Sequence, residues 1–318
     1  MNPTGFGASG GPVVVGIGIG AGGAESDAAL AFAVEEATRR GVPLKLVHGV
    51  EPLLTLTALE PAVPAEERER RAEEVLRSVA RTARVEHGDD LDVTWSVQRG
   101  TSVQALLAES DTASMIVLER RPESALRRLH TGSTTGQVAS RASCPVAVVR
   151  AGHTRQPDRS GVTVGMDASG HARFALMLAL DEAALHEEVV TVLHAFETEN
   201  KLTNDWVPYG PEELRARREQ ARVELGEAIA GWRVDFPDAE LQTHVIDGPA
   251  VDVLLTASST SRLLVVGRHR TGHVGSMALG RTAWRCMSEA DCPTLVAPPY
   301  RTSHAPERSR AGASVRRS

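Results

Sequence analysis

The sequence predicts an α/β fold of two tandem, doubly wound domains, each built on a five-stranded parallel sheet. The chain has 318 residues, about twice the length of a typical domain of roughly 150 residues. One pattern of residues occurs twice along it. In both copies short apolar segments alternate with helical segments, which is typical of parallel strands joined by right-handed crossovers.

The repeat consists of four blocks that occur in the same order in both halves of the chain. Equivalent residues lie 146 to 149 positions apart, so only a few residues of insertion separate the two copies. The equivalent pairs are Gly16 and Gly165, His48 and His194, Gly132 and Gly280, and Cys144 and Cys292.

Each copy predicts the same order of strands and helices. The strands are short apolar runs that fit a buried parallel sheet, and the longer helices show apolar residues at the i, i+3, i+4, i+7 spacing. The expected strands are 13–17, 44–50, 91–97, 114–118 and 146–149, then 162–166, 189–196, 240–246, 262–267 and 294–297. The expected helices are 26–40, 66–87 and 102–110, then 172–186, 211–232 and 249–259, with one more before each last strand.

The domain boundaries follow from a polar connection between the copies. Residues 152–161 contain Pro and Gly and read as a short linker, which gives domains 12–151 and 161–298. The tail 299–318 is rich in Arg and Ser and has no apolar period, so we expect it to be disordered.

The composition narrows the class of protein. A net charge of −6 argues against a general nucleic-acid binder, which is usually basic. The N-terminus carries no signal-peptide pattern and no apolar run is long enough to span a membrane. Three cysteines without close spacing predict neither a disulfide framework nor a zinc site. We therefore expect a cytoplasmic protein with no membrane partner.

The motifs resemble those of the universal stress protein family over nearly all of 12–298. That family ends its first strand in Val-Gly-x-Asp-x-Ser, and its fourth strand leads into Gly-x2-Gly-x9-Gly-Ser, which wraps the phosphates of ATP in nucleotide-binding members. Glycines let backbone N–H groups approach phosphates, and the next helix offers its positive N-terminus. The resemblance also implies that the last strands of the two copies pair around a pseudo-twofold axis. We nevertheless expect each copy to keep its own five-stranded sheet, so that the two sheets do not form one continuous sheet.

The second copy keeps part of the family's nucleotide motif. Residues 164–169 match the first-strand pattern, so the resemblance places Gly165 at the strand end and Asp167 toward the adenosine. Ala195 falls where the family lines the adenine pocket. Gly267 and Gly280, the latter followed after one residue by Thr282, have the spacing of the phosphate loop.

Two arginines depart from that pattern in the second copy. Arg270 replaces the middle glycine of the loop, and Arg281 replaces the serine after the last glycine. Guanidinium groups there either clamp the phosphates or fill the pocket, and one sequence leaves both readings open.

The first copy departs further. Gly16 keeps the strand-end glycine and Gly132 with Ser133 keeps the end of the loop, but Gly18 replaces the aspartate. Glu119 and Pro122 replace the first two loop glycines. A carboxylate repels phosphates and proline offers no N–H, so we expect this copy to bind ATP poorly and to act as a scaffold.

Three further patterns in the sequence resemble functional motifs. Residues 18–23 satisfy the Gly-x-Gly-x-x-Gly dinucleotide fingerprint, but the second copy has Met-Asp-Ala-Ser there, so we read a degenerate loop. Residues 7–11 fit Gly-x-Ser-x-Gly without a preceding strand. His269 and His273 have a metal-like spacing outside any expected helix, so we predict no metal site.

The sequence therefore predicts a non-catalytic stress-response protein that binds ATP, ADP or AMP in its second domain and acts through an unknown protein partner. The alternative is an interaction module in which both nucleotide pockets are non-functional. An enzyme that uses NAD through the first copy is a third reading. Pairing of the two domains within the chain still leaves a homodimer possible.

Overall fold

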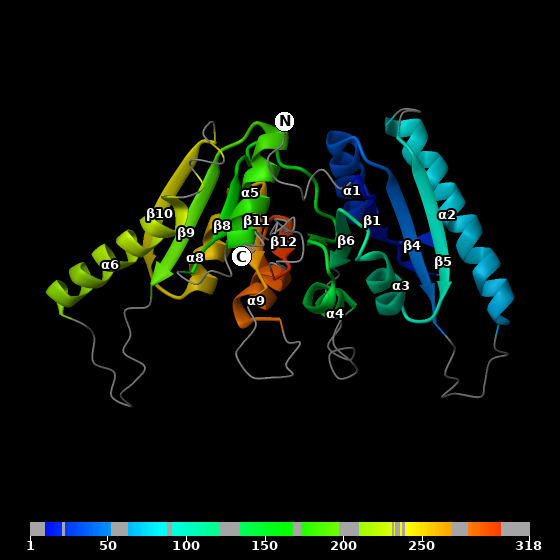
Figure 1. Cartoon of the computed structure of the whole chain (residues 1–318). Helices are drawn as coiled ribbons and strands as arrows, with labels where there is room; N and C mark the ends of the chain where they lie inside the picture. The colour runs from blue at the N-terminus through cyan, green and yellow to red at the C-terminus, as the bar shows by residue number, and fades with distance from the viewer. Residues whose placement is uncertain are drawn as a thin grey trace, which may run out of the picture.

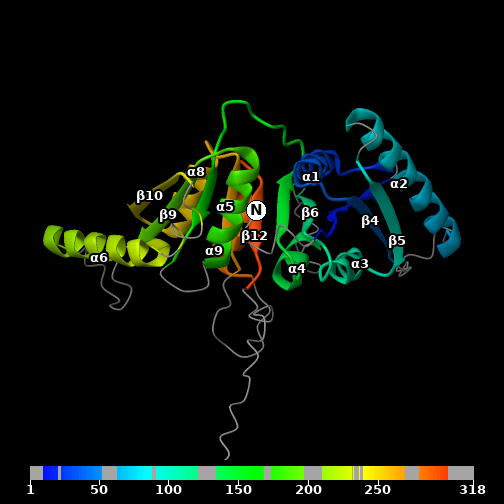
Figure 2. The same cartoon turned by 45° about the horizontal axis from the view of Figure 1, so that its top comes forward.

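Ten strands form one twisted sheet with helices on both of its faces (Figures 1 and 2). The structure is a computed structural model that describes residues 10–20, 23–51, 63–87, 91–120, 134–167, 173–196, 210–230, 232, 236, 239–268 and 279–299. The predicted disorder of the tail therefore falls, apart from Pro299, outside the described residues.

The two halves of the chain have the same topology. In each half the strands run in the order 3-2-1-4-5, and neighbouring strands of that half's five are parallel. The strands of the first half are β1 (Val13–Gly16), β4 (Leu44–Val50), β5 (Val93–Arg99), β6 (Met115–Arg120) and β7 (Val146–Arg150). Those of the second half are β8 (Val162–Gly165), β9 (Val190–Phe196), β10 (Leu241–Asp247), β11 (Leu263–Gly267) and β12 (Thr294–Ala297).

The helices form the two outer layers. One core cluster packs α1, α2, α5 and α6 against one face of the sheet, and a second packs α3, α4, α8 and α9 against the other. The helices of the first half are α1 (Asp27–Arg40), α2 (Ala65–His87), α3 (Ser102–Glu109) and α4 (Thr134–Arg141). Those of the second half are α5 (Arg173–His186), α6 (Pro211–Ala230), α8 (Ala250–Ser258) and α9 (Arg281–Glu289).

Alternation along the buried strands explains the two cores. Val13 and Val15 of β1 belong to the cluster on the α1 face, while Val14 between them belongs to the cluster on the α3 face. All three are fully buried, as expected for a parallel strand covered by helices on both sides. Such strands read as continuous apolar runs, which is why the sequence located them.

The expectation of two separate sheets is wrong. The last strands β7 and β12 pair antiparallel, with Val146 opposite Val296 and Val148 opposite Thr294, and this joins the halves into one ten-stranded sheet. Each last strand would otherwise leave unpaired N–H and C=O groups at a buried edge. The pairing of last strands that the family resemblance implied is therefore present, and it makes the sheet continuous.

A second departure lies in the glycine-rich segment after β1. Ile19–Gly20 (β2) and Gly23–Ala24 (β3) pair antiparallel outside the main sheet. The sequence predicted only parallel strands within each half and a degenerate loop here. The hairpin is held by Gly18, whose N–H donates to Ser26 Oγ at 2.9 Å and whose carbonyl accepts from Glu25 N–H.

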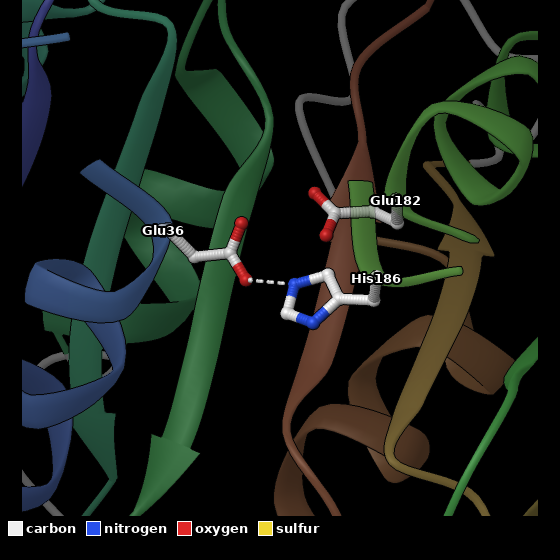
Figure 3. A group of neighbouring side chains, drawn as sticks. All are labelled: Glu36, Glu182 and His186. Atoms are coloured by element: carbon white, nitrogen blue, oxygen red, sulfur yellow. Dashed lines mark hydrogen bonds and ion pairs between the residues drawn. The ribbon is translucent and has the colours of Figure 1, made fainter. Parts of the chain in front are cut away.

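Charged side chains are buried where α1 of the first half meets α5 of the second. Glu36 and Glu182 are each 1% exposed, and Arg40 Nη2 donates to both, at 3.0 Å from Glu36 Oε2. His186 Nε2 lies 3.2 Å from Glu36 Oε1 (Figure 3). The two glutamates occupy equivalent positions in the repeat, as do Arg40 and His186, with an offset of 146 in both cases. The pseudo-twofold relation thus places two like charges together.

The surroundings of the two glutamates differ. Burial opposes ionisation of Glu36, but the hydrogen bond with His186 and the charge of Arg40 hold the pKa of Glu36 below its ordinary value. Burial and the neighbouring Glu36 carboxylate raise the pKa of Glu182 to about 7. Arg262 lies 4.0 Å from Glu36 and bonds to Glu188 at 2.6 Å. Arg40 is therefore shared by the two glutamates, whereas His186 bonds to Glu36 and Arg262 lies beside it.

None of the helices in the described ranges combines the length and the apolar character needed to cross a lipid bilayer.

Candidate functional site

A cavity of about 360 Å³ lies in the second half at the carboxyl ends of its strands. It opens between the first strand β8 and the fourth strand β11, where the direction of strand progression reverses. At such a switch point the loops after neighbouring strands diverge, and this leaves the crevice in which open α/β sheets bind ligands. The size falls within the range of roughly 300–1,000 Å³ that small-molecule sites occupy.

Seven residues that the sequence singled out line this one cavity. Gly165 and Asp167 come from the end of β8, Ala195 from β9 and Gly267 from the end of β11. Gly280, Arg281 and Thr282 come from the start of α9. Arg270 lies outside the described residues, as do His269 and His273.

Apolar side chains that sequence reasoning did not name form most of the wall. They are Met166, Leu193, Val253, Leu254 and Val266, with Ala250 and Ala283. The sequence contained a signal for these wall residues, because they follow from the alternation of side chains along β9 and β11 and from the apolar stripe of α8. An apolar wall with a few polar groups at one end suits a flat heterocycle attached to a polar or charged group.

Gly165 is required by the packing of the cavity floor. A Cβ at this position would lie 2.9 Å from Leu254 Cδ1, closer than side chains pack. Gly16 in the first half has the same role, with Leu118 Cδ2 at 2.8 Å and Leu106 at 3.3 Å from the position of a Cβ. The strand-end glycine thus makes room for a leucine of the next layer in both halves.

A histidine fixes the loop after the first strand in each half. His194 Nδ1 lies 2.9 Å from the Met166 carbonyl, and His48 Nδ1 lies 2.8 Å from the Ile17 carbonyl. Since a carbonyl oxygen can only accept, Nδ1 carries the hydrogen in both residues. The repeated histidine is therefore a structural residue that holds the chain leading to Asp167.

The start of α9 supplies positive potential to the cavity. Gly280 is the N-cap and makes no side-chain capping bond, so the first N–H groups of this nine-residue helix have no intrahelical partner. The exposed Arg281 and the partly buried Thr282 follow in the first turn and line the cavity. N–H groups without an intrahelical partner, the helix dipole and a guanidinium together favour an anion here.

The corresponding cavity of the first half is smaller, at about 160 Å³. Gly16, Gly18 and Glu119 line it together with Thr134 at the start of α4. This volume lies below the usual range of small-molecule sites. Gly132, Ser133 and Pro122 lie outside the described residues, so the loop that the sequence compared with the phosphate loop is not placed.

Glu119 occupies the mouth of the first-half cavity. Its Oε2 accepts hydrogen bonds from Ala28 N–H at 3.0 Å and from Ala29 N–H at 3.3 Å, in the first turn of α1. The carboxylate therefore sits where the dinucleotide fingerprint would place a pyrophosphate on the helix N-terminus. The Glu119 carboxylate thus occupies the position that the pyrophosphate would need if the first half bound NAD.

A single methyl group accounts for part of the difference in size. A Cβ at Gly49 would lie 2.7 Å from Ser102 N, because α3 begins against β4 at this point. Ala195, the equivalent residue of the second half, carries that Cβ, so α8 must begin farther from β9. The helix start that approaches the sheet in the first half is thus held away in the second.

One group within the described residues brings three potential metal ligands together. One ligand atom from each of Glu36, Glu182 and His186 lies within 4.8 Å of the others (Figure 3). The guanidinium of Arg40 bonds to both carboxylates, so a cation already lies between them. We interpret this group as an ion network of the interface.

The cysteines are buried rather than reactive. Cys144, Cys286 and Cys292 are at most 4% exposed, and burial raises the pKa of each thiol to about 12. The thiolate, which is the nucleophile, is therefore not populated near neutral pH.

The model of the universal stress protein family matches residues 11–150 and again residues 160–298. The chain belongs to the universal stress protein family. It carries two Usp domains in tandem.

Curated universal stress proteins of similar length align with nearly the whole chain. The universal stress protein Rv2005c of Mycobacterium tuberculosis is 29% identical over 294 residues, which cover 90% of this chain and 96% of the relative. A universal stress protein of Mycolicibacterium smegmatis is 30% identical over 283 residues, which cover 87% of this chain and 94% of the relative.

Solved structures of the family share the fold. A universal stress protein from Archaeoglobus fulgidus aligns with 91% of this chain and 97% of its own at 17% identity, with a TM-score of 0.64. Other family members were solved in complex with cAMP and with dAMP. These two align with 44% of this chain at 18% and 21% identity, with TM-scores of 0.30 and 0.33.

Proposed function

We propose that this universal stress protein binds an adenine nucleotide (ATP, ADP or AMP) in its second domain without turning it over. The bound state is then passed to a protein partner in a stress response. The observation that carries the proposal is the convergence of seven motif residues on the 360 Å³ cavity at the strand switch point. Its apolar wall suits the adenine ring, and the start of α9 suits the phosphates.

The side chains around the cavity favour binding over catalysis. Asp167 and Arg281 are the only ionisable side chains among its described lining residues. Hydrolysis of a phosphoanhydride would need a group that orients water together with charges that stabilise the transition state. A single aspartate at the adenosine end and a single arginine at the helix start do not make that set.

The nucleotide should be sought first in the protein itself. Mass spectrometry of the ligand released from freshly purified protein, followed by calorimetric titration with ATP, gives the identity and the stoichiometry. We expect one adenine nucleotide per chain. If no titration detects binding, the alternative of an interaction module with two non-functional pockets replaces this proposal.

Asp167→Ala tests which domain binds. We expect the affinity for ATP to fall by about 1–3 kcal/mol, because polar groups of the ligand and the pocket would be left unpaired. Thr134→Ala changes the first domain at the position equivalent to Thr282 and should leave binding unchanged. Binding that survives Asp167→Ala but is lost on changing Ser133 would place the nucleotide in the first domain.

Arg281→Ser separates the two readings of that arginine. If Arg281 meets the phosphates, the substitution weakens ATP more than adenosine, because adenosine has no phosphate for the guanidinium to contact. If the side chain fills the pocket, the same substitution tightens ATP binding. We expect the first result from titrations of both ligands against both proteins.

Chromatography of ATP incubated with the protein tests the absence of turnover. We expect the amounts of ADP and AMP to match those in a protein-free control. Product that accumulates with protein and is abolished by Asp167→Ala would make this chain an enzyme.

A further inference from the structure

A groove of about 650 Å³ runs between α6 and β10, at the outer end of the second half. Figure 1 shows these two elements at the end of the sheet opposite α2 and β5. The groove combines apolar and basic side chains from the helix with the edge strand. Its principal lining residues are Arg218, Arg222, Leu225, Ile229, Thr243 and Val245.

The equivalent strand position of the first half carries an indole side chain. Trp95 of β5 is opposite Leu46 in β4, and Thr243 of β10 is opposite Val192 in β9. Leu46 and Val192 are equivalent in the repeat, so Trp95 and Thr243 are equivalent as well. Trp95 packs against the core beneath α2, whereas Thr243 lines the groove. Replacement of the indole by a small hydroxyl side chain leaves the space open.

The buried residues of the two helices establish their alignment. Ala72, Leu76 and Ala80 of α2 and Ala221, Leu225 and Ile229 of α6 are all at most 6% exposed, and each pair is 149 positions apart. The same offset makes Arg218 and Arg222 equivalent to Glu69 and Glu73. At these two positions the helix therefore carries acidic residues in the first half and basic residues in the second.

An ion pair ties helix to strand in the first half. Glu69 of α2 bonds to Arg99 at the end of β5, with Arg99 Nη2 3.2 Å from Glu69 Oε2. In the second half, Arg222 lies 3.9 Å from Glu219 on exposed surface, and Arg218 makes no ion pair within the described ranges. Because the contact of Arg222 with Glu219 is long and solvent-exposed, an anionic partner can compete for Arg222 as well as for Arg218.

The strand beside the groove ends the sheet. β10 is the terminal strand, so no described strand accompanies its outer edge. Residues 241–247 contain neither Lys nor Pro, the residues that usually protect such an edge, and Ile246 is 37% exposed. An extended peptide can pair with an edge of this kind and direct alternate side chains to one face.

We propose that the groove binds an acidic segment of a partner protein, which adds to β10 as an extended strand and inserts one large apolar side chain beneath α6. The apolar side chain takes the volume that Trp95 fills in the first half. Carboxylates on either side of it pair with Arg218 and Arg222. The inference rests on the partner-binding part of the proposed function and not on nucleotide binding.

Charge argues against the chain's own C-terminal tail as the occupant. Residues 299–318 carry five arginines and one glutamate. Such a segment is repelled by the two arginines of the groove, whereas an acidic segment is attracted by them.

Fluorescence anisotropy with the full chain tests the proposal. The probe is a labelled synthetic peptide, Glu-Asp-Glu-Leu-Trp-Glu-Asp-Glu, and the comparison peptide has Lys at every acidic position. We expect the acidic peptide to bind at least about tenfold more tightly than the basic one, which corresponds to ~1.4 kcal/mol. Equal binding of the two peptides, or no binding of the acidic one, overturns the proposal.

Three variants locate the binding. Thr243→Trp restores the side chain of the first half, and Arg222→Glu restores its charge; each should weaken the acidic peptide about tenfold or more. Arg215→Glu makes the same charge change on α6 at a position that does not line the groove, and should leave binding unchanged. If both Thr243→Trp and Arg222→Glu bind the acidic peptide as the wild type does, the groove is not the binding site. If Thr243→Trp fails to fold, the result for Arg222→Glu alone tests the groove.

Two further measurements distinguish peptide binding in the groove from nucleotide binding and from dimerisation of the chain. Asp167→Ala should leave peptide affinity unchanged, so a failure of the nucleotide proposal does not count against the groove. If light scattering detects a dimer of the chain, we expect that dimer to persist in the Thr243→Trp variant. A dimer that Thr243→Trp dissociates would make a second copy of the chain the occupant and would overturn the acidic-peptide proposal.

Discussion

The pockets of the two halves share one backbone topology and differ in what lies at equivalent positions. The first half places the Glu119 carboxylate at the strand end and bonds it to the N-terminus of α1. The second half has Gly267 there, and the cavity is about 360 Å³ instead of 160 Å³. In the first half Glu119 thus binds the N-terminus of α1, and in the second half the N-terminus of α9, a different helix of the repeat, has no side-chain cap among the described residues.

The difference shows that two copies of one fold can carry pockets of different size and lining. The residues that close the first pocket are not core residues of the sheet, and Glu119 contributes a helix cap in return. The residues that keep the fold, such as Gly16 and Gly165, are the same in both halves. Positions that support the fold and positions that shape the pocket therefore lie side by side at the same strand ends.

The largest expected effect concerns the interface helices, where Arg40 and His186 are equivalent. Arg40→Met leaves Glu36 and Glu182 buried without their shared cation, and should cost about 3–5 kcal/mol of unfolding free energy. His186→Gln keeps a donor for Glu36 and should cost about 1 kcal/mol. Urea denaturation measures both. Equal costs would mean that the two equivalent positions contribute alike, contrary to the observed bonds.

Glu182→Gln tests the asymmetry between the two buried glutamates through pH. The folded pKa of about 7 exceeds the ordinary value of 4.5, so the folded state holds a proton that the unfolded state releases between these values. The free energy of unfolding of the wild type should therefore fall as pH rises from about 4.5 to about 7, by up to ~3 kcal/mol. The variant should lack this decrease. Parallel pH profiles of the two proteins, measured in urea, would contradict the assignment.

Gly49→Ala and Ala195→Gly exchange two equivalent residues that line the two cavities. The new Cβ at Gly49 would meet the backbone of Ser102, so α3 must shift at a cost of about 1–2 kcal/mol. Ala195→Gly meets no such contact and should cost about 0.5–1 kcal/mol. Thermal unfolding ranks the two. The reverse ranking would remove helix approach as the reason for the smaller first pocket.

A small effect is also expected at the helix cap of the first pocket. Glu119→Ala removes the acceptor of two N–H groups of α1 and should cost about 1 kcal/mol of stability. Because the cavity remains small, calorimetry should still show a single ATP site per chain. A second site that appears in this variant would show that the carboxylate alone excludes the nucleotide.

The repeat made much of the fold predictable. Apolar strands that are buried on both faces stand out as continuous runs, and their order with helices implies parallel strands. The ends of elements were less exact, since β5 begins at Val93 and not at residue 91. The β2–β3 hairpin was missed because its glycine-rich sequence resembles a loop and its backbone bonds are local.

The candidate site was predictable where motif residues follow strands. Asp167, Gly267 and Gly280 could be named because they match the nucleotide motif of the universal stress protein family. The residues of the opposite wall of the cavity were not predicted, although the apolar stripe of α8 contains residues of that wall. The sequence predicted only that Glu119 places a negative charge at this position. It did not predict the hydrogen bonds to Ala28 and Ala29 in α1, because nothing near residue 119 in the sequence indicates these partners.

The sequence by itself determined the two copies, the order of their elements and the positions at which they differ. Those properties depend on local periodicity and on comparison of equivalent residues. Tertiary structure alone decided that β7 and β12 join the sheets, that Arg40 reaches Glu182 142 positions away, and that Thr243 opens a groove that Trp95 closes. Each of these depends on which faces meet across the pseudo-twofold axis or between helix and sheet edge, and the packing of distant elements sets that geometry.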